Sequence, residues 1–209
     1  MKKLLHIIAT PRAQDSRTLK VTEAFLESFR KKYPDCAIDE FNVTSEALSS
    51  LTVEVVSGKY VLLSGGELTE KLKAAWRGVE RHINRFLSAD AYLISTPMWN
   101  FSIPYPLKQY IDVIVQPKYL FRYTDKGIEG LVKNKKMVVI ATRGGDYSPE
   151  STFHNYDFQE PYLRAIFRFV GITDITFIIA QPMDALGQQV QKEKIEAAKV
   201  MAINLAKSF

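Results

Sequence analysis

Three polar segments of the chain hold the side chains best suited to bind a ligand. They are residues 10–18 (TPRAQDSRT), 96–104 (TPMWNFSIP) and 142–147 (TRGGDY), and each directly follows an apolar run. Hydroxyls, amides, glycine or arginine fill them, and the second segment adds aromatic rings. Such groups suit a phosphate and a flat ring, so the three segments are the candidate binding loops.

The first segment carries hydroxyls and an arginine beside the predicted start of a helix. Thr10, Arg12, Ser16 and Thr18 would face N–H groups that a helix start leaves free, where the helix dipole also favours a phosphate. The segment has no glycine, which excludes the GxGxxG fingerprint and the GxxxxGK[ST] phosphate loop at this position. The structural alternative is that Asp15 or Ser16 only caps the helix and Arg12 is a solvated charge.

The second segment places aromatic side chains around an amide. Met98, Trp99 and Phe101 surround Asn100, and turn-forming residues interleave with them. Exposed aromatic side chains suit a flat ring ligand, and Asn100 can both donate and accept hydrogen bonds at its edge. The alternative is that Trp99 and Phe101 belong to the core or to a subunit interface.

The third segment combines glycines with a permanent cation. Gly144 and Gly145 let backbone N–H groups approach a ligand closely, and Arg143 could stabilise negative charge on a reduced ring. The alternative is an ordinary glycine turn after a strand.

Strands that alternate with helices must position these segments. Short apolar runs predict strands at residues 4–9, 37–43, 91–95, 136–141 and 175–180. Apolar residues at helical spacing predict helices at 19–33, 69–87, 107–114 and 188–207. Residues 45–68 have no strong period. The alternation predicts a doubly wound α/β fold, whose ligands bind at the carboxyl ends of parallel strands.

Composition favours one soluble domain over residues 1–209. The 46% of hydrophobic residues is enough for a sizeable core. The 28 basic and 23 acidic residues are mixed along the chain, so the net charge of +5 supports attraction to phosphorylated cofactors but not a nucleic-acid binder.

Cysteine, histidine and hydropathy exclude other classes of site. The single cysteine, Cys36, rules out an internal disulfide, and His6, His82 and His154 lack metal-ligand spacing. No segment approaches the roughly 20 apolar residues that span a bilayer. We therefore expect a cytoplasmic protein with no metal site, no membrane segment and no nucleic-acid partner.

Four segments together resemble a known family. PMWNF (97–101), FRYTDKGIEGLV (121–132), TRGG (142–145) and PYLRAIFRFVGITD (161–174) are similar, in order and spacing, to blocks of the FMN-dependent NADH azoreductases, which also reduce quinones. The resemblance spans most of the chain. It implies a flavodoxin-like fold: a doubly wound five-stranded parallel sheet, order 2-1-3-4-5, with helices on both faces.

The resemblance also implies which residues hold FMN. The first segment would bind the phosphate, and the other two would embrace the isoalloxazine ring. The predicted contacts are Thr10, Gln14, Asp15, Ser16, Thr18, Pro97, Met98, Trp99, Asn100, Phe101, Thr142, Arg143, Gly144 and Gly145. Family members often have S-x-S where this chain has Gln14, Asp15 and Ser16. Because a carboxylate repels phosphate, we expect Asp15 to offer its backbone N–H or to point away.

The activity implied by the resemblance needs no catalytic side chain, because the flavin carries the chemistry. NADH or NADPH would reduce FMN and leave, and a quinone or azo compound would then take its place in a ping-pong cycle. Tyr123 and Phe169 match aromatic residues on the substrate side. The alternatives are a flavodoxin-type electron carrier, which is usually acidic with a [ST]-x-T-G-x-T loop, and a non-catalytic flavin-binding protein.

A homodimer with shared active sites is the last expectation. Tyr119, Leu120, Phe121 and Tyr123 crowd the segment 114–130, and a monomer with no second domain would leave them as an exposed apolar patch. A C2 partner could bury that patch, and related azoreductases are dimers with the flavin near the interface. The alternative is that residues 116–130 fold back as a hairpin over their own subunit.

Overall fold

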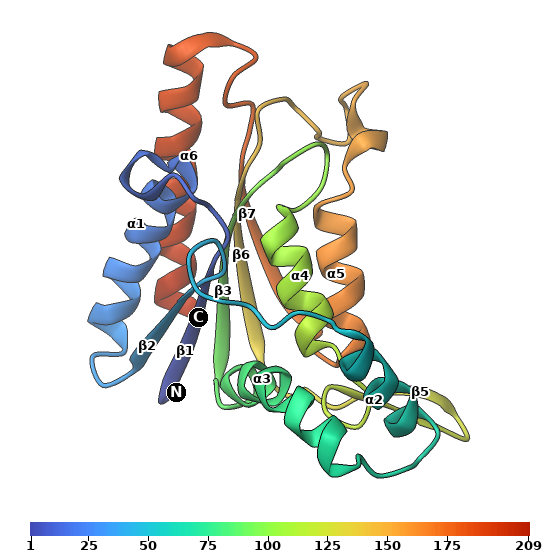
Figure 1. Cartoon of the computed structure of the whole chain (residues 1–209). Helices are drawn as coiled ribbons and strands as arrows, with labels where there is room; N and C mark the ends of the chain where they lie inside the picture. The colour runs from blue at the N-terminus through green and yellow to red at the C-terminus, as the bar shows by residue number, and fades with distance from the viewer.

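A sheet of five parallel strands forms the centre of the computed structural model, which describes all 209 residues (Figure 1). The strands are β1 (Lys3–Ile8), β2 (Ala37–Asn42), β3 (Ala91–Pro97), β6 (Lys136–Thr142) and β7 (Asp174–Ala180), in the order β2-β1-β3-β6-β7. The predicted five-stranded parallel sheet is therefore confirmed. Its fourth and fifth strands are numbered β6 and β7 because an additional hairpin, β4 (Phe121–Thr124) and β5 (Gly127–Gly130), precedes them.

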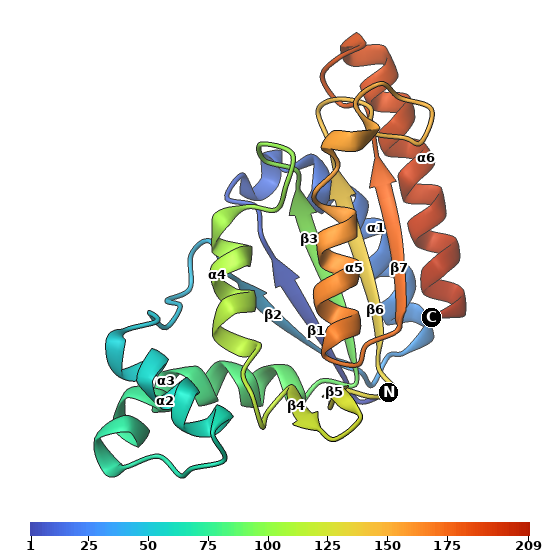
Figure 2. The ribbon, with the colours of Figure 1, turned by 90° about the vertical axis from the view of Figure 1, so that its right-hand side faces the viewer.

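Helices cover both faces of the sheet, and each face has its own apolar core (Figure 2). One face packs against α1 (Arg17–Lys32) and α6 (Gly187–Ser208); the other packs against α3 (Glu70–Leu87), α4 (Tyr105–Ile114) and α5 (Glu160–Phe169). Neighbouring strand residues point to opposite faces, so Leu4 joins the α1–α6 core and Leu5 the other. This double burial explains why the strands read as continuous apolar runs.

Sequence periodicity does not predict two of the helices. The first is α2 (Val53–Leu63), inside the stretch without a period, and the second is α5, between the last two strands of the sheet. Short 3₁₀ turns at Ala13–Asp15 and His154–Tyr156 complete the chain. All the helices and strands that the sequence does predict are present, with their ends shifted by a few residues.

Hydroxyl side chains cap three of the helices. Ser16, Thr52 and Thr69 precede α1, α2 and α3, and each side-chain oxygen accepts a hydrogen bond from the N–H three residues later, at 3.3–3.4 Å. Such a cap stabilises a helix start by about 1 kcal/mol. Ser16 therefore caps α1, and its contact with a phosphate stays a prediction.

The hairpin β4–β5 packs against its own subunit. Phe121 is buried, and its ring lies 4.8 Å from that of Phe169 at the end of α5. Leu120 is also buried, while Tyr119 stacks on Trp76 at 5.9 Å between ring centroids. The expectation that this segment leaves Tyr119, Leu120 and Phe121 for a partner to cover is wrong, because the same chain already buries Leu120 and Phe121 and half-buries Tyr119.

A buried histidine predicts a loss of stability in acid. His82 on α3 is buried against Phe41, its Nε2 has no hydrogen-bond partner, and burial, aided by Arg81 and Arg85, lowers the pKa of His82. The folded state therefore resists protonation of His82. The contribution of His82 to the free energy of unfolding is fully present above the unfolded pKa near 6.5 and is lost as the pH falls below that value.

We expect His82→Phe to reduce this acid-side loss. Urea unfolding at pH 7.5 and at pH 5.5 would measure it, with the exposed His154 replaced in the control variant. An equal decline in the two variants would contradict the assignment.

Candidate functional site

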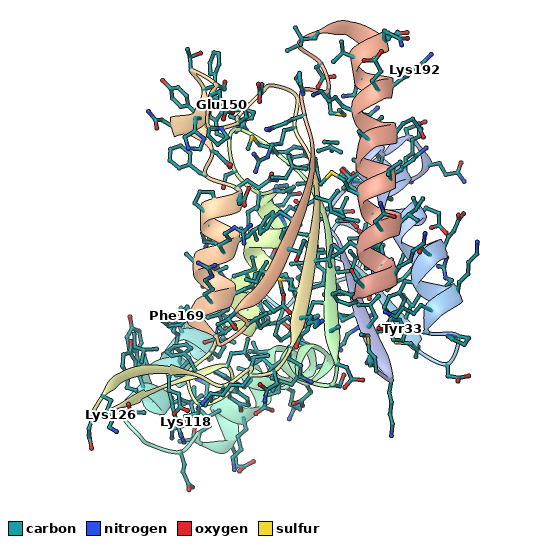
Figure 3. The ribbon with its side chains drawn as sticks, turned by 180° about the vertical axis from the view of Figure 1, so that it is seen from behind. Tyr33, Lys118, Lys126, Glu150, Phe169 and Lys192 are labelled. Atoms are coloured by element: carbon teal, nitrogen blue, oxygen red, sulfur yellow. The ribbon has the colours of Figure 1, made fainter.

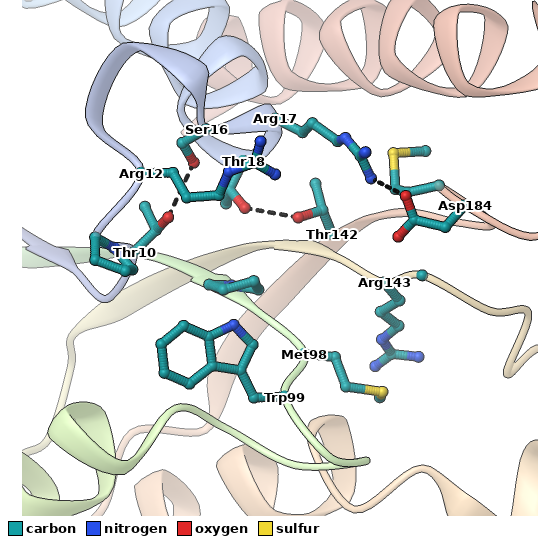
Figure 4. Close-up of a pocket in the computed structure, with 14 residues that line it drawn as sticks. Thr10, Arg12, Ser16, Arg17, Thr18, Met98, Trp99, Thr142, Arg143 and Asp184 are labelled. Atoms are coloured by element: carbon teal, nitrogen blue, oxygen red, sulfur yellow. Dashed lines mark hydrogen bonds and ion pairs between the residues drawn. The ribbon is translucent and has the colours of Figure 1, made fainter. Parts of the chain in front are cut away.

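A cavity of about 230 Å³ lies at the carboxyl ends of the parallel strands (Figure 4). The loops after β1, β3 and β6 meet there, as predicted, together with the loop after β7. Its lining residues are Thr10, Pro11, Arg12, Ser16, Arg17, Thr18, Pro97, Met98, Trp99, Thr142, Arg143, Gly144, Met183 and Asp184. Four of these residues are not among the predicted contacts: Pro11, Arg17, Met183 and Asp184. The last two follow β7 without any recognisable motif.

Buried hydroxyls form one wall of the cavity. The Thr10 hydroxyl donates to Ser16 Oγ at 3.2 Å, and Thr18 Oγ1 lies 2.7 Å from Thr142 Oγ1. All four residues are buried. Since Arg17 and Thr18 begin α1, their N–H groups have no carbonyl one turn back within the helix. This wall offers hydroxyls, N–H groups and the positive end of the helix dipole to an anion.

Gln14 and Asp15 do not line the cavity. Both are exposed, and the N–H of Asp15 donates to the carbonyl of Arg12 at 3.0 Å. The backbone N–H of Asp15 is thus already bonded within the chain, and its carboxylate is not among the groups that line the cavity. A direct contact of either residue with a phosphate stays a prediction.

Two arginines add positive charge at the cavity. Arg12 is exposed beside it, and Arg17 Nη1 lies 2.6 Å from Asp184 Oδ1. This ion pair ties the start of α1 to the loop after β7. The Asp184 carboxylate is more exposed than Arg17, so the pair is a surface one and contributes little to stability.

The loop after β3 makes a tight two-residue turn. Trp99 and Ser102 exchange two backbone hydrogen bonds of 2.9 Å, and the residues between them have positive φ, 45° at Asn100 and 69° at Phe101. This conformation is unusual for phenylalanine and persists only where other contacts impose it. Trp99 and Phe101 are 38% and 41% exposed, so neither is a core residue. The turn presents their rings at the protein surface.

Gly144, in the loop after β6, packs closely against the loop after β7. A Cβ on Gly144 would lie 3.0 Å from Asp184 Oδ2, and the Gly144 carbonyl accepts from the N–H groups of Met183 and Asp184 at 3.1 and 3.0 Å. These backbone bonds join the loops after β6 and β7 beside the cavity, and a side chain at position 144 would displace the exposed Asp184 carboxylate.

Arg143 does not present its charge to the cavity. The residue is 2% exposed, its Nη1 lies 3.0 Å from Asp157 Oδ2, and its Nε donates to Gln159 Oε1 at 3.0 Å. Burial lowers the pKa of the guanidinium, while Asp157 and Glu160 oppose that shift. The expectation that Arg143 places its cation against a bound ring is wrong in this structure, because partners inside the chain hold the guanidinium. Its backbone remains beside the cavity.

A second cavity, of about 750 Å³, borders the first at Trp99. It lies beside α4 and is more apolar than the first. Its lining residues are Ser50, Leu51, Trp99, Asn100, Ser102, Ile103, Tyr105, Lys108, Gln109, Asp112 and Tyr162. A polar cavity beside a larger apolar one fits a ligand with an anionic tail and a flat ring.

Tyr123 and Phe169 lie at the other end of the sheet. The hairpin and the end of α5 are near the amino ends of the strands, where Figure 3 labels Phe169 far from Glu150 and Lys192. Tyr123 is exposed and Phe169 half-buried. Within one chain these two residues do not meet the cavity.

The structure contains no group of three or more His, Cys, Asp or Glu side chains placed to hold a metal ion. None of its helices combines the length and the apolar character needed to cross a bilayer.

Comparison with known proteins gives matches over the whole fold. The family described as "Flavodoxin-like fold" matches residues 2–204. The FMN-dependent NADH:quinone oxidoreductase of Nitratidesulfovibrio vulgaris strain DP4 is 35% identical over 207 residues, covering 97% of this chain and 99% of the relative. FMN-dependent NADH:quinone oxidoreductase 2 of Clostridium acetobutylicum is 38% identical over 206 residues, covering 97% and 98%.

Solved structures show the same similarity. An azoreductase from Bacillus anthracis strain Sterne matches with a TM-score of 0.90 and 29% identity, covering 100% of both chains. An FMN-dependent NADH-azoreductase from Bacillus anthracis strain Ames Ancestor, in complex with FMN, matches with a TM-score of 0.85 and 31% identity, covering 99% of this chain and 100% of the other.

Proposed function

The chain belongs to the family of FMN-dependent NADH:quinone oxidoreductases and azoreductases with the flavodoxin-like fold, and from this we propose that it binds FMN and reduces quinones and azo compounds with NADH. The observation that carries the proposal is the meeting of three polar loops at one cavity at the carboxyl ends of β1, β3 and β6. That edge of a doubly wound sheet is where such folds bind nucleotides.

The residues present fit the phosphate of FMN. Thr10, Ser16 and Thr18 supply buried hydroxyls, and the N–H groups that start α1 lie beside them. Arg12 adds positive charge at the same cavity, where Arg17 is paired with Asp184. Hydroxyl and N–H donors to a charged acceptor contribute about 1.5–3 kcal/mol each.

The loops after β3 and β6 fit the ring. Pro97, Met98 and Trp99 approach the cavity from one loop, and Thr142 and Gly144 approach it from the other. Bound FMN would supply the two-electron chemistry between NADH and the acceptor. The chain orients the ring and leaves the larger apolar cavity beside Trp99 for the reactants. We propose that NADH and the acceptor occupy that position in turn, which is a ping-pong order.

The function is tested by adding FMN and then NADH. Saturation at 100 times Kd should stabilise the protein by about 2.7 kcal/mol and raise its melting temperature by roughly 5–10 °C. Riboflavin, which lacks the phosphate, is the matched control and should stabilise far less. No change in flavin fluorescence or in melting temperature would exclude FMN. Uptake of FMN without oxidation of NADH by a quinone would instead indicate an electron carrier or a non-catalytic flavin-binding protein.

We further propose that the working unit is a C2 homodimer whose two sites are shared. Tyr123 is exposed at the end of the sheet opposite to its own cavity, so it can reach a bound substrate only in a second copy. Aromatic side chains also stay exposed around the cavity end of the molecule, at Trp99, Phe101, Tyr105, Phe153, Tyr156 and Phe158. A symmetric partner can bury both groups, because each copy offers both surfaces.

Mixing two impaired variants tests the shared site. Ser16→Asp keeps a helix cap but places a negative charge at the phosphate wall, and Tyr123→Ala removes the proposed substrate contact. Each is expected to have low activity alone. Statistical exchange of subunits should restore about a quarter of wild-type activity, because half of the dimers then contain one intact site. A monomeric mass in sedimentation, with full NADH:quinone reductase activity, would refute the shared site.

A further inference from the structure

One buried amide bridges the two loops that approach the proposed ring site. Gln159, immediately before α5, is 0% exposed. Its Oε1 accepts from Arg143 Nε at 3.0 Å, and its Nε2 donates to the carbonyl of Pro97 at 2.8 Å. The first bond holds the loop after β6 and the second holds the loop after β3. An amide suits this position because it carries both a donor and an acceptor.

The two residues before Gln159 reinforce the bridge. Asp157 Oδ2 pairs with Arg143 Nη1 at 3.0 Å, and Asp157 Oδ1 accepts from the N–H of Gln159 at 3.0 Å. The N–H of Phe158 donates to the carbonyl of Phe101 at 2.9 Å. Residues 157–159, here called the clasp, therefore bind the loop after β3 at both ends and the loop after β6 at its arginine.

The backbone pairing of β3 with β6 ends where the two loops begin, so it adds little to holding the loops together. Pro97 opposes Thr142 at the end of the β3–β6 ladder, and the N–H of Met98 adds one further bond to the Thr142 carbonyl at 2.9 Å. Arg143 Nη2 has no hydrogen-bond partner in the chain, and Nη1 has a further, longer hydrogen bond to Gln181 Oε1 at 3.4 Å. The contacts with the clasp, at Nε and at Nη1, are therefore the shortest ones that hold the guanidinium.

We propose that the clasp fixes the spacing of the loops after β3 and β6, and that Gln159 is a positioning residue for the flavin ring. This inference rests on the proposed function, since the loops are those that would hold the ring. Gln159 does not line the cavity itself and acts through Pro97 and Arg143. Removing the amide would leave the buried Nε–H of Arg143 without its partner and the Pro97 carbonyl with only the Thr96 hydroxyl, at 3.1 Å, which loosens both loops.

Two variants and a matched control separate this role from general stability. Gln159→Leu removes both bonds, while Gln159→Glu keeps the acceptor for Arg143 and loses the donor to Pro97. Gln189→Leu, at an exposed position of α6, is the control. The measurements are amide hydrogen exchange at Met98 and Phe158 without FMN, then the Kd and visible spectrum of bound FMN, and kcat with KM for NADH.

We expect Gln159→Leu to speed exchange at both amides, to shift the flavin absorption bands and to raise the Kd for FMN. The upper bound of that rise is about 10- to 100-fold, reached if the whole free energy of the lost hydrogen bond to the charged Arg143 is taken from FMN binding. Gln159→Glu should show the same changes to a smaller extent, and it decides the question if Gln159→Leu does not fold. If the Gln159 variants keep the wild-type exchange rates, flavin spectrum and Kd for FMN, the proposed role of the clasp is overturned. Failure of the wild-type protein to bind FMN would instead overturn the proposed function.

Discussion

Replacing Asp157 by alanine is expected to lower the free energy of unfolding by about 3–5 kcal/mol, the range for removing one partner of a buried ion pair. Asp157 and Arg143 both lie within the protein, with side chains 7% and 1% exposed. The variant would leave the guanidinium buried with Glu160 Oε2 as its nearest remaining acid, at 3.9 Å. Urea unfolding at neutral pH measures the loss.

A control and a rescue distinguish the ion pair from the turn that Asp157 also supports. Asp146 accepts a similar turn bond from the N–H of Ser148 at 2.9 Å but is exposed, so Asp146→Ala should cost below about 1 kcal/mol. Adding Arg143→Met to Asp157→Ala removes the unpaired charge and should recover part of the stability. A loss below about 1 kcal/mol for Asp157→Ala alone would show that the pair is not needed.

Replacing Ser16 by alanine is expected to weaken FMN binding by about 1–3 kcal/mol, or roughly 5- to 150-fold in Kd, the cost of leaving a charged acceptor one hydrogen bond short. Ser16 Oγ lies at the cavity and receives the Thr10 hydroxyl at 3.2 Å. Titration of flavin fluorescence measures the Kd, and activity should recover when FMN is saturating.

The control for Ser16→Ala is Thr69→Ala. Thr69 caps α3 as Ser16 caps α1, so both substitutions should lower stability by about 1 kcal/mol. Thr69 does not line the cavity, so only Ser16→Ala should change the Kd for FMN. If the Kd is unchanged in both variants, the phosphate site lies elsewhere, and Arg12 and Thr18 are the next residues to test.

The sheet could be predicted because its strands are buried on both faces. In β3, residues 91–96 are all buried, so the apolar run and the strand coincide. The helix α2 could not be predicted, because its apolar side chains do not follow its buried face. Val53 and Tyr60 are 79% and 65% exposed, which removes the helical period from the sequence.

The candidate site was predictable at the level of loops and less so for single side chains. Parallel strands bring their carboxyl ends to one edge, which is why three separate segments meet at one cavity. The direction of Arg143 depends instead on Asp157 and Gln159, which belong to no motif. The backbone of Asp15 likewise depends on a turn with Arg12. Such local partners are fixed by packing, which the residue pattern of a loop does not contain.

The turn at Asn100 and Phe101 lowers the stability of the fold and presents a ring that we propose to serve ligand binding. A phenylalanine at a φ of 69° costs about 1–2 kcal/mol relative to a residue that adopts this region freely, and asparagine at 45° costs less. Selection for heat resistance alone would therefore favour glycine at position 101. That change would remove the ring that lies 5.3 Å from Tyr156 and is exposed at the cavity end of the molecule. We expect libraries screened only for thermal tolerance to lose Phe101, and libraries screened for turnover to retain it at the expense of melting temperature.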